Sequence, residues 1–212
     1  MRIVLLGKPG SGKGTLAALL SSSLGLPHLS SGEILRQAIR ERTPLGLEVE
    51  NHVLRGEIGP EDLIASAVLD HIDRIGLGYG HVLDGFPRTI LQAEMLDRRF
   101  PPDLCVLIEV ADRTVVERIG GRLCCAGCGA VYHSRSLPPL CRDRCDSCGG
   151  GLSAREDDSE EAVRRRIEVF ARQVIPVIDH YEARGGLQSF DGEKPPERVF
   201  EEVRKAISSR SG

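Results

Sequence analysis

A chain of 212 residues, of which 41% are apolar, can bury one sizeable hydrophobic core and has room for a small inserted module. Its formal net charge of -3 argues against a broad nucleic-acid-binding face, and no apolar stretch is long enough to cross a bilayer. The N-terminus carries no recognisable secretory signal, so we expect a cytoplasmic protein without a membrane partner.

The first 24 residues read as a buried strand, a glycine-rich loop and a helix in direct succession. The apolar run 3–6 precedes the loop G-K-P-G-S-G-K-G-T at 7–15, and a helix is predicted over 13–24. Glycines allow such a loop to point its N–H groups inward, and the helix adds its positive N-terminal end. This hollow suits a polyphosphate, although a plain glycine turn before a helix is the simpler alternative.

Two side chains of this loop carry candidate chemistry. The pattern G-x-x-x-x-G-K places Lys13 within reach of β and γ phosphate oxygens, and Thr15 is the hydroxyl candidate on the Mg²⁺ side. Thr15 comes one position later than usual because Gly14 intervenes. The loop residues predicted to hold the polyphosphate are Gly10, Ser11, Gly12, Lys13, Gly14 and Thr15.

The next segment is predicted to be helical throughout. Ser31 offers a cap for a helix whose apolar stripe leaves Arg36 off its buried side, and further helices are expected over 45–55 and 61–75. Because no strand separates these helices, we expect a helical flap attached to a sheet.

A short buried strand over 81–84 ends in an acid, Asp84, and precedes G-F-P-R-T and another helix. An acid at the carboxyl end of a parallel strand lies beside the phosphate loop, so Asp84 is the candidate Mg²⁺-side carboxylate. The alternative is that Asp84 caps the following helix. A further strand over 104–110, containing Cys105 as a core residue, and a helix over 112–120 follow.

The segment 122–158 interrupts this alternation of strands and helices with cysteines. Cys125 and Cys128 form one C-x-x-C pair, Cys145 and Cys148 form another, and sixteen residues separate the pairs. This spacing predicts a closed four-thiolate zinc site, which is structural because no position is left for water. We expect Cys124 and Cys141 to be bystanders, and His133 to be a surface or substrate-side residue.

The C-terminal part returns to helices. A long helix is predicted to start at Ser159 and to bend at Pro176, and one of the three consecutive arginines 164–166 could face inward. A last short strand over 187–190, a turn, and a closing helix over 195–208 complete the expected elements.

Taken together, these motifs resemble adenylate kinases of the long-lid type over nearly the whole chain. The matching pieces are the loop at 7–15, L-S-S-G-E-I-L-R at 29–36, D-G-F-P-R-T at 84–89 with Gln92, Y-H at 132–133, R-E-D-D at 155–158 and R-R-R at 164–166. The resemblance implies an α/β P-loop nucleoside monophosphate kinase fold, with a parallel five-stranded sheet flanked by helices. It divides the chain into a core (1–29, 61–121 and 159–212), a flap that binds the monophosphate (30–60) and a zinc-ribbon lid (122–158).

The resemblance also implies roles for individual residues. AMP would be bound by Ser31, Arg36, Glu57, Ile58, Gly85, Arg88, Gln92, Arg155 and Arg166. ATP would be bound by the loop residues 10–15 with Arg118, Arg122, Tyr132 and Lys194. The residues expected to act on the transferring phosphoryl group are Lys13, Arg88, Arg118, Arg122, Arg155 and Arg166.

The implied activity is the reversible reaction ATP + AMP = 2 ADP, which maintains the balance of adenine nucleotides. The implied cofactors are Mg²⁺ with ATP and a structural Zn²⁺ in the lid. The expected partners are the nucleotides ATP, AMP and ADP, with no nucleic acid, and the expected state is a monomer.

Two other functions are compatible with parts of the pattern. One is a related kinase that uses UMP or CMP as acceptor or GTP as donor. The acceptor base is open in any case, because a flipped Gln92 amide could pair with guanine instead of adenine. The other is a P-loop ATPase whose zinc ribbon grips nucleic acid. A basic ribbon would favour it, but 122–166 holds eight arginines against seven acidic residues.

Overall fold

The computed structural model describes residues 1–77 and 79–210 of the chain. Five parallel strands form the main sheet in the order β2-β3-β1-β4-β8. The strands are β1 (Arg2–Gly7), β2 (His28–Ser30), β3 (His81–Asp84), β4 (Leu104–Glu109) and β8 (Leu187–Asp191). The predicted α/β class and the parallel five-stranded sheet are therefore confirmed.

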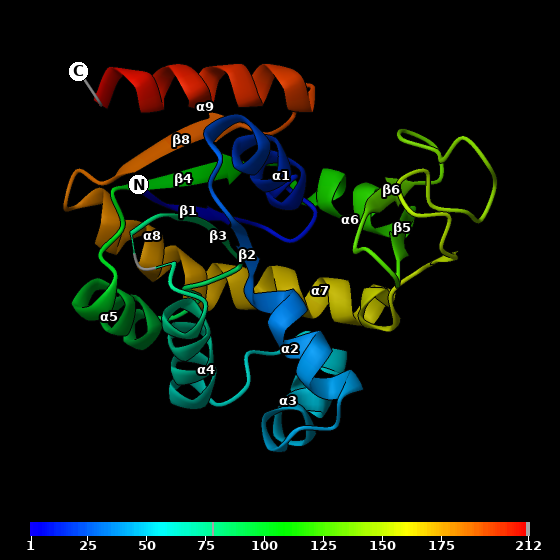
Figure 1. Ribbon diagram of the computed structural model, residues 1–212, viewed down its shortest axis with the longest axis horizontal. Helices are drawn as coiled ribbons and strands as arrows, with labels where there is room; N and C mark the ends of the chain where they lie inside the picture. Colours follow the sequence, from blue (N-terminus) through cyan, green and yellow to red (C-terminus); the bar gives the residue numbers. More distant parts are fainter. Residues whose placement is uncertain (78, 211–212) are drawn as a thin grey trace.

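Helices cover both faces of this sheet (Figure 1). One face packs against α1 (Lys13–Leu24) and α9 (Pro196–Arg210), through buried side chains such as Leu5, Leu20 and Val203. The other face packs against α4 (Glu61–Arg74), α5 (Ile90–Arg99) and α8 (Ile175–Glu182). Burial on both faces explains why the strands are nearly continuous apolar runs.

The expected helical flap consists of α2 (Ser31–Arg40) and α3 (Pro44–Arg55), at the bottom of Figure 1. Gly46 faces the end of α2 so closely that a Cβ there would clash with the carbonyl oxygen of Ala38. Thr43 caps α3 by accepting a hydrogen bond from Gly46 N, and the buried side chains of Leu35 and Val49 join the main core. The flap is thus held by packing between backbones and by a shared apolar core.

The cysteine-rich segment forms a separate small sheet beside α6 (Asp112–Gly120). Its antiparallel strands are β5 (Arg122–Cys125), β6 (Val131–His133) and β7 (Leu152–Ser153), in the order β6-β5-β7. His133 Nε2 lies 3.2 Å from the carbonyl oxygen of Glu117 on α6. This contact connects the small sheet to the core.

The predicted long helix is interrupted upstream of Pro176. The 3₁₀ turn Glu156–Asp158 leads into α7 (Glu160–Val169), a π-helical turn spans Phe170–Val174, and α8 follows. Proline lacks an N–H and its ring clashes with a carbonyl of the preceding turn, so the helix accommodates it by widening. The cap predicted at Ser159 is confirmed, because its hydroxyl accepts a hydrogen bond from Ala162 N.

Two local expectations differ from the structure. A fifth strand was expected, but the position of β2 was not identified, because three residues are too few to show a strand pattern. The cap predicted at Ser31 is wrong: Ser31 is the first residue of α2, and its hydroxyl donates to the carbonyl oxygen of Gly85 at 2.7 Å. Among the residues described, no helix has both the length and the apolar character that crossing a bilayer requires.

Candidate active site

The glycine-rich loop connects β1 to α1 and points its lysine back across itself. Lys13 Nζ donates to the carbonyl oxygens of Gly7, at 2.8 Å, and Lys8, at 2.7 Å. Gly7, Gly10 and Gly12 have positive φ, and a Cβ on Gly7 would lie 2.5 Å from the carbonyl oxygen of Ile108. The loop therefore takes a conformation that other residues resist, closely packed against the end of β4.

Burial disfavours the ammonium of Lys13 and lowers its pKa to about 8, and the charges of Arg88, Arg122 and Arg166 act in the same direction. The carboxylate of Asp84 opposes this shift only in part. Three arginines far apart in the sequence therefore act on the lysine of the loop. These side chains share one electropositive region.

Asp84 stands at the end of β3, next to β1 in the sheet and close to the loop. Burial alone would raise the pKa of Asp84, but His28, whose Nε2 lies 3.9 Å away, and the charge of Lys13 outweigh it and lower the pKa. The following helix is capped by Thr89, which accepts from Gln92 N. The helix-cap alternative for Asp84 is therefore wrong, and its carboxylate is an ionised group facing the loop.

A second group of predicted residues gathers around Gly85. The Gly85 carbonyl oxygen accepts from Arg88 Nε and from the Ser31 hydroxyl, both at 2.7 Å. Gln92 is buried, with Oε1 accepting from Arg88 N at 2.8 Å and Nε2 donating to the Glu61 carbonyl at 3.4 Å. These contacts fix the side chains of Arg88 and Gln92 on the flap side of the loop.

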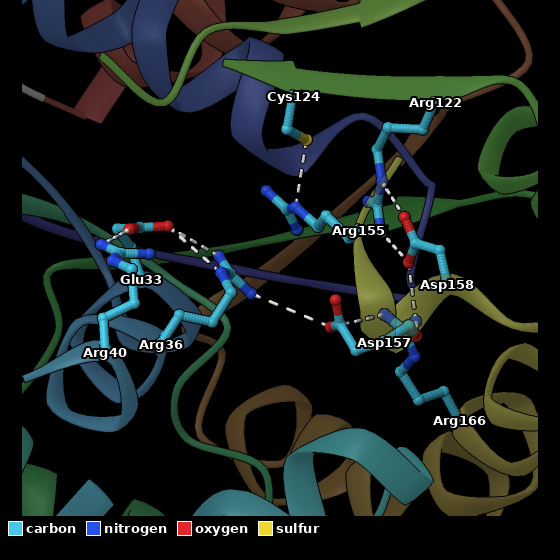
Figure 2. Close-up of polar contacts among 9 residues, drawn as sticks. All are labelled: Glu33, Arg36, Arg40, Arg122, Cys124, Arg155, Asp157, Asp158 and Arg166. Carbon is cyan, nitrogen blue, oxygen red and sulfur yellow. Dashed lines mark hydrogen bonds and ion pairs between the residues drawn. The ribbon is translucent and has the colours of Figure 1, made fainter. Parts of the chain in front are cut away.

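The third group is a network of arginines and carboxylates that joins the flap, the lid and α7 (Figure 2). Asp158, only 4% exposed, accepts from Arg122 through both carboxylate oxygens, at 2.5 and 2.8 Å, and from Arg166 at 2.8 Å. Asp157 lies 3.8 Å from Arg166 and 4.0 Å from Arg36. Of the three consecutive arginines, Arg166 is the one that faces inward.

Figure 2 shows three further contacts. Glu33 accepts from Arg36 at 3.1 and 3.2 Å and from Arg40 at 2.8 Å. Arg155 Nε donates to the sulfur of Cys124 at 3.0 Å. Each cation of the network thus has a partner within the protein, and an anionic ligand such as a phosphate could replace those partners.

Other predicted residues have their partners outside this network. Arg118 donates to the Gly192 carbonyl at 2.8 Å, and Lys194 pairs with Glu202 at 2.8 Å. Glu57 pairs with His52 at 3.2 Å. The structure does not bring Tyr132 to the arginine network: its ring is buried in the lid, and its hydroxyl lies 3.5 Å from the sulfur of Cys145.

The four cysteines of the two C-x-x-C pairs converge within the lid. All four sulfurs lie within 4.8 Å of one another, with Cys125 and Cys148 at 3.4 Å and Cys128 and Cys145 at 3.5 Å. A tetrahedral site with Zn–S bonds of about 2.3 Å separates its sulfurs by about 3.8 Å. The thiol set therefore fits a zinc ion, whereas Cys124 and Cys141 are not members of the cluster.

Some functional candidates escaped the sequence analysis. Asp157 and Asp158 were visible only as part of R-E-D-D, and nothing in that motif identifies their partners. His28 could not be placed beside Asp84 because β2 was not predicted. The contact between Cys124 and Arg155 depends on the pairing of β5 with β7, which brings Cys124 opposite Ser153.

Comparisons with known proteins agree with one another. The family whose sequence model matches residues 5–186 is described as "Adenylate kinase". Relatives named "Adenylate kinase" include one from Methanocella arvoryzae, 41% identical over 212 residues that cover 98% of each chain. Others come from Clostridium tetani and Clostridium perfringens, 39% and 41% identical over 214 residues that cover 99% of each chain.

The lowered pKa of Lys13 predicts how polyphosphate binding depends on pH. Above about pH 8 the empty loop holds a neutral Lys13, so binding an anion to the ammonium requires uptake of a proton. We expect the affinity for tripolyphosphate to fall by up to about tenfold per pH unit above 8, relative to a Lys13→Arg variant, which stays charged. Calorimetric titration from pH 7 to 9.5 measures the ratio of the wild-type affinity to that of Lys13→Arg. Because the ligand's own ionisation affects both proteins equally, it cancels in this ratio. An unchanged ratio would contradict the assignment.

Proposed function

The chain belongs to the adenylate kinase family. We propose that it transfers the γ-phosphoryl group of ATP reversibly to AMP, giving two ADP. It is a phosphotransferase with a phosphate group as acceptor. Through this reaction it would maintain the balance of adenine nucleotides.

The observation that carries this proposal is the shared electropositive region. Arg88, Arg122 and Arg166 act on Lys13, and Arg36 and Arg166 act on Arg88, so cations from the loop, flap, lid and α7 lie within electrostatic reach of one another. Bringing two polyphosphates head to head requires cancellation of their repulsion and alignment of donor and acceptor. These cations would supply the cancellation, and no general base is needed because the attacking phosphate oxygen is already an anion.

We assign the donor and acceptor sides as follows. ATP would be bound by Gly10, Ser11, Gly12, Lys13, Gly14, Thr15, Arg118, Arg122 and Lys194. AMP would be bound by Ser31, Arg36, Glu57, Ile58, Gly85, Arg88, Gln92, Arg155 and Arg166. Lys13, Arg88, Arg118, Arg122, Arg155 and Arg166 would stabilise the charge of the transferring group, by replacing their internal partners with phosphate oxygens.

The metals would have separate tasks. Thr15 and Asp84 would hold Mg²⁺ or its waters, and the ion would offset phosphate charge. The four-cysteine cluster would hold a structural Zn²⁺ that does not contact substrate but stabilises a lid with a small apolar core. The proposed units are the core (1–29, 61–121 and 159–212), the flap (30–60) and the lid (122–158), and closure of the lid would exclude water. A monomeric state and the absence of a nucleic-acid partner stay predictions.

The fixed orientation of Gln92 supports adenine as the acceptor base. Flipping the amide would place its NH₂ against Arg88 N–H and its oxygen against the Glu61 carbonyl, and would lose both hydrogen bonds. The amide therefore presents one remaining donor on Nε2 and one remaining acceptor lone pair on Oε1. The edge of adenine offers one acceptor and one donor that could pair with them.

The function is tested by ADP formation from Mg-ATP with AMP, GMP, CMP and UMP in turn, and without acceptor. We expect rapid turnover with AMP only, because the chain belongs to the adenylate kinase family. Turnover with another acceptor would keep the fold and chemistry but overturn the assigned specificity. Equal ATP consumption without acceptor would favour the P-loop ATPase alternative instead.

Arg88→Ala should slow phosphoryl transfer to AMP by about 10²- to 10³-fold and raise the KM for AMP, because a charge-assisted contact to phosphate is lost. The control is Arg98→Ala, which removes an exposed arginine from the same helix region and should leave both constants unchanged. Steady-state kinetics with both variants measures the difference. A wild-type rate for Arg88→Ala would refute its role.

Cys125→Ser should reduce bound zinc and lower the melting temperature much more than it changes turnover at low temperature. The reason is that Cys125 lies inside the lid cluster, away from the arginine network. Metal analysis and thermal unfolding check this result, with Cys141→Ser as the matched control outside the cluster. A full complement of zinc in Cys125→Ser would exclude Cys125 as a ligand.

A further inference from the structure

The phosphate loop contains a second lysine, Lys8, that the proposed function does not use. Its side chain leaves the loop toward the connection between β4 and α6, more than a hundred residues away in sequence. There Nζ donates to the carbonyl oxygen of Val110 at 3.0 Å and to Asp112 Oδ1 at 2.5 Å. The Lys8 side chain is 25% exposed and that of Asp112 is 62% exposed.

The main chain of Lys8 contacts the functional lysine at the same time. Its carbonyl oxygen accepts from Lys13 Nζ at 2.7 Å and from Ser11 N at 3.2 Å. Lys8 therefore contacts the segment between β4 and α6 through its side chain, and Lys13 and the turn of the loop through its backbone. A displacement of Lys8 would shift the carbonyl that places Lys13.

The charge of Lys8 is already neutralised within the protein. Asp112 forms its ion pair, whereas Lys13 has no carboxylate among its hydrogen-bond partners in the described part of the chain. Gly7, directly before Lys8, packs on the Ile108 carbonyl at the end of β4. The start of the loop thus rests on β4, and the Lys8 side chain fastens it to the segment that follows β4.

We propose that Lys8 is a positioning residue for the ATP donor: its bridge to Val110 and Asp112 holds the phosphate loop in the geometry in which Lys13 and the loop amides bind phosphate. This inference rests on the proposed function. The alternative is that Lys8 leaves Asp112 and contacts the nucleotide phosphates directly. The two roles differ in their need for Asp112. A positioning role requires the ion pair with Asp112, whereas a direct contact of Lys8 with phosphate would be weakened by that ion pair.

The test compares Lys8→Met, Lys8→Arg, Asp112→Asn and the double variant Lys8→Met/Asp112→Asn in steady-state kinetics. We expect Lys8→Met and Asp112→Asn each to raise the KM for ATP about fivefold, the size of one ion pair, with little change in the KM for AMP. The double variant should be no worse than either single variant, because both remove the same interaction. Lys8→Arg should restore most of the affinity.

The matched control is Lys205→Met, which removes an exposed lysine from α9 and should leave the KM for ATP unchanged. If Asp112→Asn leaves the KM for ATP unchanged or lowers it while Lys8→Met raises it, the positioning role is wrong and Lys8 contacts phosphate. Wild-type constants in all variants would also overturn it. A wild-type chain that forms no ADP would refute the proposed function instead, and calorimetric ATP affinity of the same variants would then decide the role of Lys8.

Discussion

Mutual repulsion among cationic side chains is the constraint on which this structure depends. Lys13, Arg36, Arg88, Arg122 and Arg166 act on one another across a partly buried space, where charges are screened less than in water. The protein balances them with few carboxylates, chiefly Asp84, Asp157 and Asp158, and with backbone carbonyls around Arg88 and Arg118. Where a partner is neutral or shared, part of the positive charge stays available to an anionic ligand.

The fold brings this charge from elements that are far apart in the sequence. The rigid parallel sheet presents the loop and Asp84 at the carboxyl ends of adjacent strands, as expected for an open α/β sheet. The flap contributes Arg36, the lid Arg122 and Arg155, and α7 Arg166. Because the carboxylates that join these units also neutralise their arginines, a phosphate ligand that takes over the arginines would change how flap and lid are held.

Most of the fold and of the candidate chemistry was predicted from local sequence motifs. The loop at 7–15, the four cysteines of the lid and the capped helix starts depend on short-range spacing, so they were recognisable. Contacts set by tertiary structure were not. The strand β2 gains its identity only by pairing with β3, Ser31 uses its hydroxyl on Gly85 rather than as a cap, and Cys124 meets Arg155 through strand pairing. The interruption near Pro176 was expected as a bend, but its π-helical form depends on how the preceding turn repacks.

The close approach of Gly46 to Ala38 limits how the flap can move. Where two helices touch through backbone atoms, neither can slide along the other without opening a gap that no side chain fills. We therefore expect helices α2 and α3 to move as one rigid body. Any hinges would lie at its two ends, before Ser31 and in the segment 56–60. The αL glycine at 56 and Pro60 stand at the second of these ends. Any motion of the flap would thus have to rotate the pair as a unit and carry Arg36 along an arc, and it would separate Leu35 and Val49 from the main core.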